Sequence, residues 1–509
     1  MLLLAATAVC AQPAASPYVP LDSWIYPALD RLAAWGLVPS QISGQRPWTR
    51  AECRRQLAEA DTLAAGSGEY ALRLLRALHA EFDADAPAVV LDSFYLRAGG
   101  IAGPALDDSY HLGETWTNDQ GRPFGRGAGG YAGADLRAAS GRFFGAARVE
   151  FQRAPGMEPY PQAVRQTLAK LDGVPLSAGG AAAVSRFRAV EAYAGVRLGD
   201  VQVSVGKQSL WWGPGYEAPL SFSANAEPTR NVKVSTVSPV RLGRVGVRAE
   251  FVLGSLRGPW FNAQKVSFQL TRNLEMGFTR WSIFWGAGHP ATAGSFLRNF
   301  SSFDSPAGPA RSDPGDRKAG FDFRYRVPGL RRWLTLYTDS YSDDDPSPLA
   351  APRRAAIAPG IYLARFPGLP RLDLRIEAPS TQPMGWDMGG RFFYFNTQYR
   401  SGNTNYGRLL GNAVGRDGRA VQAWLRWWLP GRGRIEASYR QGKTSGKFLP
   451  GGATQSDGIL RAAFDLAPSW SLSAMSQYER FYVPLLGGAR RNLSGWVQLA
   501  WTPALKLLP

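Results

Sequence analysis

Apolar and polar residues alternate along most of this chain, in stretches of about ten residues that are separated by turns. Between residues 371 and 377 every even-numbered position is aliphatic and every odd-numbered position is charged. Residues 147–152 and 247–253 alternate in the same way. Successive side chains of a strand point to opposite faces, so each such stretch predicts a strand with one apolar and one polar face.

Strands of this kind predict a closed barrel with lipid outside and water inside. The pattern runs from about Asp92 to Thr502, which at ~10 residues per strand plus turns and loops gives roughly sixteen to eighteen antiparallel strands. No stretch holds the ~18 consecutive apolar residues of a membrane helix. The 17 Trp and 19 Tyr residues suit the aromatic girdles at the membrane interfaces. We therefore expect an all-β transmembrane barrel over residues 89–503, located in a bacterial outer membrane.

The first eleven residues predict a signal peptide, because an apolar stretch ends in a Val-x-Ala cleavage site after Ala11. Cys10 raises the alternative of a lipoprotein signal, although Val9 stands where such a signal expects a small residue. After cleavage Cys53 is the only cysteine of the mature chain, so no disulfide framework is expected.

Residues 17–85 have a helical rather than a strand pattern. Leu29 and Leu32 form an apolar stripe that ends near Gly36. A capping box at 49–52 (Thr-Arg-Ala-Glu) predicts the start of a second helix, and a third is expected from about Glu69 to Ala80. Together these helices predict a small periplasmic α-helical bundle in front of the barrel.

The segments between strands fall into two classes. Three short ones are predicted to be tight periplasmic turns: 197–200, 430–433 and 466–469. Four long, polar or Gly/Pro-rich ones are predicted to be extracellular loops: 156–183, 286–318, 339–359 and 403–418.

One run cannot form a regular transmembrane strand. Residues 206–216 read Gly-Lys-Gln-Ser-Leu-Trp-Trp-Gly-Pro-Gly-Tyr, and proline and glycine interrupt strand pairing. A bent segment in the lumen is expected to present indole faces for sugar stacking and polar groups for hydroxyls. The alternative is a girdle pair or a lumen plug without a ligand. The candidate polysaccharide-binding residues are Lys207, Trp211, Trp212, Gly213, Pro214, Gly215 and Asn225.

This run resembles the Wzi-type capsule assembly proteins, in which a similar Gly-Trp-Trp-Gly-Pro-Gly stretch precedes an Asn-Ala-x-Pro stretch, here residues 225–228. The helical start also looks like that family at 21–24, Leu29, Leu32, 36–38, 46–47 and 49–52. The resemblance implies an outer-membrane barrel of about eighteen strands with a periplasmic helical bundle. It further implies a lectin that holds capsular polysaccharide at the cell surface.

Two other functions fit parts of the sequence. Alternation and a charged lumen alone suit a porin or oligosaccharide channel equally well. The N-terminal helices also vaguely resemble a single S-layer homology module, a type that grips cell-wall polymer and normally acts in sets.

The net charge of +18 narrows the choice of partner. Of 58 basic residues, eight are lysines and the rest arginines, whose planar fork suits carboxylates and phosphates. This favours an anionic surface polysaccharide and the lipid and lipopolysaccharide of the outer membrane. An exported barrel does not meet nucleic acid, so that partner is discounted, and a monomer is expected. The alternative is that luminal arginines merely pair with Asp and Glu across the barrel.

The sequence offers no catalytic constellation. The three histidines (His79 on the third helix, His111 in an early strand and His289 in a solvated loop) have no metal-ligand spacing, and no Gly-x-Ser-x-Gly occurs. The acidic triplet 343–345 lacks the spacing of a calcium loop and is expected to be an exposed charge run. We predict a non-enzymatic protein without cofactor or metal.

Overall fold

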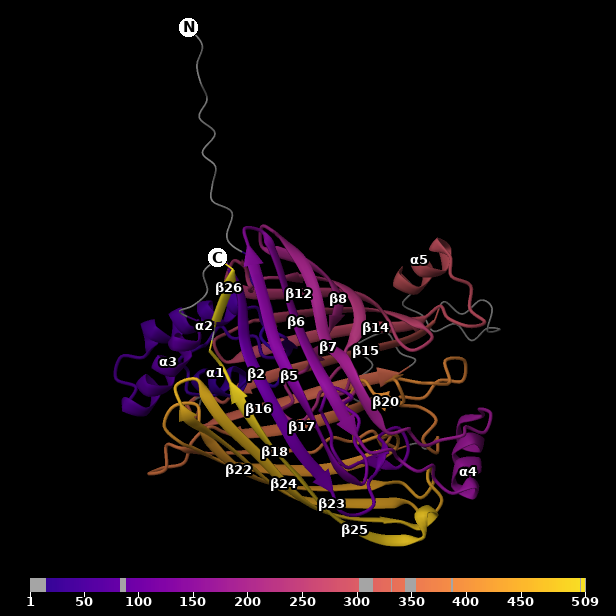
Figure 1. Cartoon of the computed structure of the whole chain (residues 1–509). Coiled ribbons are helices and arrows are strands. Elements are labelled where there is room, and N and C mark those ends of the chain that lie inside the picture. The colour runs from indigo at the N-terminus through magenta and orange to yellow at the C-terminus, as the bar shows by residue number, and fades with distance from the viewer. Residues whose placement is uncertain are drawn as a thin grey trace.

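The structure is a computed structural model that describes residues 15–82, 88–301, 315–330, 332–343, 354–385, 388–503 and 505–508. Its dominant feature is a closed antiparallel barrel (Figure 1). The barrel strands are β2 (Ala88–Ile101), β5 (Gly127–Ser140), β6 (Phe143–Ala154), β7 (Val184–Leu198), β8 (Val201–Gln208), β10 (Thr229–Thr236), β11 (Val240–Leu242), β12 (Val245–Ser255), β13 (Trp260–Gln269), β14 (Leu274–Phe284), β15 (Asp316–Arg326), β16 (Leu334–Asp343), β17 (Ala355–Leu363), β18 (Leu372–Glu377), β21 (Gly418–Trp428), β22 (Arg434–Thr444), β23 (Ala453–Ala467), β24 (Trp470–Val483), β25 (Gly488–Trp501) and β26 (Leu505–Leu508).

Within the described residues the barrel has eighteen strands. The short β11 continues β10, because both pair with β12. Likewise β26 continues β25, because both pair with β2. Strand β2 also pairs with β5, which closes the sheet. The predicted fold class, a barrel of sixteen to eighteen strands with an N-terminal helical region, is confirmed.

The alternation in the sequence separates the two faces of the wall. In β12 the side chains of Arg248 and Glu250 are buried, whereas those of the intervening Val247, Ala249 and Phe251 are more exposed. Outward-facing Val205, Leu425 and Val497 are 45–59% exposed, which is the surface a lipid environment covers. The inward face therefore carries the charge, and the outward face is apolar.

The two ends of the barrel differ in their connections. Strands are joined by short turns at one end, here called the short-turn end, as at 199–200, 429–433 and 468–469. At the opposite, long-loop end the connections include α4 (Gln162–Asp172) and α5 (Ala293–Ser301). Figure 1 shows α4 and α5 projecting on the side opposite the N-terminal helices.

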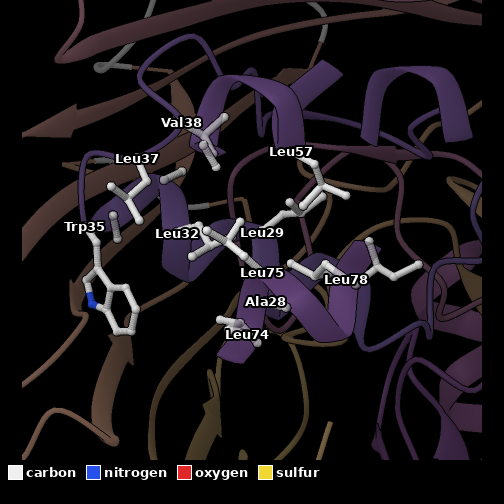
Figure 2. Packing of buried hydrophobic residues seen from close by; sticks show 14 of the residues in the cluster. Ala28, Leu29, Leu32, Trp35, Leu37, Val38, Leu57, Leu74, Leu75 and Leu78 are labelled. Carbon is white, nitrogen blue, oxygen red and sulfur yellow. The ribbon is translucent and has the colours of Figure 1, made fainter. Parts of the chain in front are cut away.

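The N-terminal helices α1 (Ile25–Ala34), α2 (Arg50–Leu63) and α3 (Glu69–Phe82) lie at the short-turn end. Helix α2 begins as expected, since the Thr49 side chain accepts a hydrogen bond from the Glu52 backbone N–H at 2.9 Å. Figure 2 shows leucines from all three helices meeting in one cluster. That cluster also contains Tyr337, Tyr362 and Trp428 of the barrel strands, so the helices share a core with the wall.

Long segments of the long-loop end fold into the lumen. We call three of them the plug segments: 102–126, 209–228 and 378–417, of which residues 386–387 are not described. They carry the short strands β3 (Asp107–Asp108), β4 (Gly113–Glu114), β9 (Trp211–Trp212), β19 (Thr404–Asn405) and β20 (Arg408–Leu409). Their aromatic residues share a buried cluster with inward-facing wall residues such as Trp281 and Tyr341. The lumen is thus filled from both ends, because the N-terminal segment enters from the other side.

Several expected loops differ from the structure. Residues 403–418 were expected to be extracellular, but much of that segment is buried inside the barrel. Strand β16 extends to Asp343 and β17 starts at Ala355, so the described parts of 339–359 are mostly wall. Asp343 is buried beside Lys318, at 3.1 Å, rather than part of an exposed run. Its neighbours 344–345 and the predicted signal peptide lie outside the described residues. Among the helices described, none has the length and apolarity needed to span a membrane.

Candidate functional site

Trp212 forms the centre of the plug. Its side chain is fully buried, and its indole N–H donates to Glu250 Oε1 on β12 at 3.2 Å. Its ring packs edge-on against Phe222 with centroids 5.1 Å apart, and Phe222 in turn contacts Trp281 of the wall at 4.9 Å. The indole therefore connects the plug segment 209–228 to the barrel.

The same segment pairs with the N-terminal chain. Strand β9 runs antiparallel to β1 (Gln45–Arg46), and the Gly213 N–H donates to the Gly44 carbonyl at 2.8 Å. A side chain at Gly213 has no room, because a Cβ there would lie 2.8 Å from Asp339 Oδ2. Glycine at this position thus allows the plug segment 209–228 and the N-terminal chain, which enter the barrel from opposite ends, to meet.

The other candidates of the run are also buried. Pro214 lines a small internal cavity of about 20 Å³ with Asp30 and Arg375, and Gly215 lies next to it in the chain. Asn225 connects plug segments, since its Oδ1 accepts from the Asn118 N–H at 3.1 Å and its Nδ2 donates to the Leu409 carbonyl at 3.3 Å. The structure brings these residues together as packing elements.

Direct sugar stacking on the Trp pair does not fit this arrangement. Trp211 is 8% exposed and Trp212 is 0% exposed, so protein covers both indoles. The indole N–H of Trp211 is buried without a hydrogen-bond partner, which leaves one polar group unsatisfied in the plug. The geometry favours the plug interpretation of these tryptophans over direct ligand contact.

Lys207 lies apart from the other candidates. Its ammonium group pairs with Glu227 and donates to the Ala189 carbonyl at 2.7 Å. It lines an open groove of about 1070 Å³ in the barrel wall, which we call the wall groove. The cationic residues of the wall groove are Arg186, Arg188, Lys207, Arg230 and Arg257. Sequence reasoning identified only Lys207, because the others are scattered over two strands and a turn.

Most luminal arginines are paired. Arg122 bonds Glu150 at 2.6 Å and Asp119 at 2.9 Å, and Arg416 bonds Asp172 at 2.5 Å. In helix α1, burial alone would raise the pKa of Asp30, but Arg46 and Arg375 outweigh it and lower the pKa below its usual range. The interpretation that luminal arginines neutralise carboxylates therefore holds for these pairs.

The arginines and lysines outside the lumen have a different environment. A set of exposed cations surrounds the mouth at the long-loop end, and we call them the loop-face cations: Arg126, Lys170, Arg298, Arg391, Arg400, Lys447 and Arg490. Among the described residues of this end, Glu158 is the one exposed carboxylate. This face therefore carries an excess of positive charge toward the solvent.

The histidines are held by other side chains. His111 lies in a turn rather than in the expected strand, and its two ring nitrogens lie 2.8 Å from Asp108 and 2.9 Å from Asp172 of α4. Burial opposes its charged form, but the two carboxylates outweigh burial and raise the pKa of His111 to about 9. His289 is half-buried and stacks on Tyr399 at 4.3 Å instead of being fully solvated. Within the described ranges no group of three His, Cys, Asp or Glu residues is placed to hold a metal ion.

A family model described as capsule assembly protein Wzi matches residues 97–492. The chain belongs to the Wzi capsule assembly family. In a search of curated proteins, an uncharacterized 55.8 kDa protein in the cps region of Klebsiella pneumoniae is 27% identical over 186 residues. That match covers 32% of this chain and 34% of the Klebsiella protein, so it spans about a third of that relative.

Among solved structures, Escherichia coli Wzi superposes with a TM-score of 0.72 at 18% identity, covering 96% of this chain and all of that one. Its description is an outer-membrane protein involved in group 1 capsule assembly and a carbohydrate-binding β-barrel. Pseudomonas aeruginosa OprD superposes with a TM-score of 0.43 at 12% identity over 82% of this chain. The first match shows that this Wzi-family chain shares the fold of the E. coli barrel.

Proposed function

We propose that this protein is a non-catalytic outer-membrane lectin that binds an acidic surface polysaccharide at its long-loop end and retains it at the cell surface. Membership of the Wzi family and the carbohydrate-binding description of the E. coli structure support this class of ligand. The observation that carries the acidic preference is the excess of loop-face cations over exposed carboxylates. Arginine recognises carboxylate and phosphate groups in a planar, bidentate geometry.

The orientation follows from the connections. Outer-membrane barrels have short turns on the periplasmic side and longer loops outside. Helices α1 to α3 therefore face the periplasm in this proposal, and the loop-face cations face the polysaccharide layer. The N-terminal region is then a periplasmic bundle docked into the barrel mouth, with the protein acting as a monomer.

Binding of a charged polymer is the direct test. Purified protein in neutral detergent is expected to bind polygalacturonate but not the neutral polymer dextran. The affinity should fall steeply as salt rises from roughly 50 mM to roughly 500 mM, because screening weakens contacts between exposed charges. Binding of both polymers with no salt dependence would contradict a role for the loop-face cations.

A matched pair of variants locates the site. Arg391→Ser with Arg400→Ser removes two loop-face cations from one plug segment. Arg241→Ser with Arg244→Ser removes two exposed arginines from the hairpin of β11 and β12 at the short-turn end. The first variant is expected to bind polygalacturonate about tenfold more weakly, since each exposed contact contributes about 0.5–1 kcal/mol. The second variant should bind like the wild type. Equal losses of affinity in both variants would argue against a binding site at the long-loop end.

A porin or oligosaccharide channel is the competing function. The lumen holds two large buried clusters, one from the N-terminal helices and one from the plug segments. A barrel filled in this way is expected to show little steady current in planar bilayers. A stable open conductance of the folded wild-type protein would favour the channel instead.

We also infer that the run 211–215 acts indirectly, by holding the plug that supports the loop face. Trp212, Gly213 and Asn225 connect plug segments to the wall and to the N-terminal chain. In this proposal Lys207 is the one candidate of the run that reaches an open surface.

A further inference from the structure

The wall groove arises where a barrel strand loses its neighbour. In the described structure β7 pairs with β8 only from Ala192 to Leu198, because β8 ends at Gln208 and the chain turns into the lumen. The half of β7 from Val184 to Glu191 therefore has no strand beside it on that edge. Gly121, Glu227 and Tyr406 of the three plug segments line the resulting opening.

The wall groove is strongly positive. Its lining holds five cationic side chains and one carboxylate, Glu227, which is shared between Lys207 and Arg188. Arg186 and Arg230 are exposed and have no ion-pair or hydrogen-bond partner among the described residues. Arg188 is 8% exposed, and its Nε is buried without a hydrogen-bond partner. Arg188 is already bonded to Glu227 and to the Gln120 and Gly121 carbonyls, so the cations that face the groove without an anionic partner in the described structure are Arg186 and Arg230.

Apolar side chains of the outer wall line the same groove. Phe187 is 81% exposed, Val205 is 59% exposed and Val232 is 39% exposed, and all three line the groove. Phe187 packs against the outward-facing Phe151 at 5.1 Å and is otherwise uncovered. Cations next to an exposed apolar surface suit a ligand that has an anionic headgroup and hydrocarbon chains.

Like charges elsewhere on the outer wall point to the same environment. On β24 and β25 the exposed Arg480 and Arg491 lie directly opposite each other, as do Arg419 and Lys443 on β21 and β22. Directly opposed like charges destabilise a sheet unless something neutralises them. Arg419 and Arg491 share the outward face of their strands with the apolar Val421 and Leu493. Anions at the membrane surface would offset this repulsion.

We propose that the wall groove binds the phosphorylated headgroup of an anionic glycolipid of the outer leaflet, with its acyl chains along Phe187, Val205 and Val232. Arg186 and Arg230 take the phosphate oxygens. This site is separate from the loop face, and it does not depend on the proposed polysaccharide binding. A bound lipid would supply the missing partners of the groove and fill the gap beside β7.

The test compares two lipids that differ only in phosphate. Wild-type protein in neutral detergent is titrated with bisphosphorylated lipid A and with the same lipid after removal of both phosphates, and bound lipid is counted by native mass spectrometry. The phosphorylated lipid is expected to bind at least about tenfold more tightly, because charge-assisted hydrogen bonds require the phosphate. Equal binding of the two lipids would overturn the proposal.

Variants then assign the binding to the groove. Arg186→Ser with Arg230→Ser is expected to reduce the preference for the phosphorylated lipid to about threefold or less, since two charge contacts are lost. Arg244→Ser with Arg272→Ser, two exposed arginines of short turns, is the matched control and should keep the full preference. Heat-modifiable migration on unboiled gels confirms that each variant is folded. A groove variant that retains the full preference would overturn the proposal.

Two further measurements distinguish the proposed lipid from other possible occupants of the wall groove. Phe187→Ser is expected to weaken lipid A binding about fivefold without changing competition by inorganic phosphate, because it removes apolar contact area. Inorganic phosphate that competes as well as the lipid would show that the acyl chains play no part. Loss of polygalacturonate binding in the Arg186 and Arg230 variant, with lipid binding unchanged, would make the groove a glycan site instead.

Discussion

The luminal arginines and the arginines among the loop-face cations have different roles, although the two groups are interspersed along the chain. Arg122 is 5% exposed and paired with two carboxylates, whereas Arg126, four residues later, is exposed at the mouth. Luminal arginines hold the plug and wall together, so their charge is neutralised. The outward positive field therefore comes from exposed cations, among them the loop-face cations and those of the wall groove. The comparison shows that net charge alone does not locate a binding surface.

The largest effect is expected from the centre of the plug. Trp211→Ala with Trp212→Ala empties a fully buried position and should lower the free energy of unfolding in detergent by about 3–5 kcal/mol. The loosened plug should also give open-channel events in planar bilayers. Trp427→Ala, which removes a tryptophan from the outer face, is the control and should show no channel events.

This variant also tests the indirect role of the tryptophans. If they only support the plug, the folded fraction should still bind polygalacturonate, with an affinity within about threefold of wild type. A well-folded, non-conducting double variant that fails to bind the polymer would instead support direct contact between these tryptophans and the polysaccharide.

The second largest loss of stability is expected at Arg122, in contrast to Arg126. Arg122→Ala leaves Glu150 buried without its main partner and should cost about 3 kcal/mol or more. Arg126→Ala should change the free energy of unfolding by no more than about 0.5 kcal/mol. Denaturant titration of folded protein in detergent measures both. Similar costs at the two positions would remove the distinction between luminal and loop-face arginines.

A smaller effect concerns pH. The pKa of His111 is raised from 6.5 to about 9 by Asp108 and Asp172, so the charged imidazole stabilises the contact between α4 and the plug segment 102–126. This contribution is complete below pH 6.5 and is lost as pH rises through about 9. We expect protease cleavage near α4 to increase between these values in the wild type. His111→Gln should flatten the pH dependence of this cleavage. A variant that keeps the wild-type pH profile would contradict a role for His111.

The smallest structural effect is expected at the loop face. Arg391→Ser with Arg400→Ser should shift the free energy of unfolding by less than about 0.5 kcal/mol per site, because both side chains are exposed. Thermal unfolding on gels measures this shift alongside the binding loss. A large destabilisation would mean that these arginines hold the plug, as the luminal ones do.

The sequence by itself determined the barrel and its helical start. Period-two alternation requires a strand with two unlike faces, and a strand in lipid must close its hydrogen bonds within a barrel. The capping box at Thr49 placed the start of α2, since cap chemistry is local. The break in strand geometry near Trp211 was also visible, because proline and glycine act on their own backbone.

Only the tertiary structure decided what residues 206–216 contact and where the unpaired positive charge lies. The pairing of β1 with β9 joins residues more than 160 positions apart, and no local pattern encodes that contact. The wall groove depends on where β8 leaves β7, and the neutralisation of each arginine depends on strand register. Burial of His111 against α4 and of Asp343 beside Lys318 of β15 likewise depends on which segments the fold brings together. Long-range packing sets these features, because it determines which side chains lose water and which keep it.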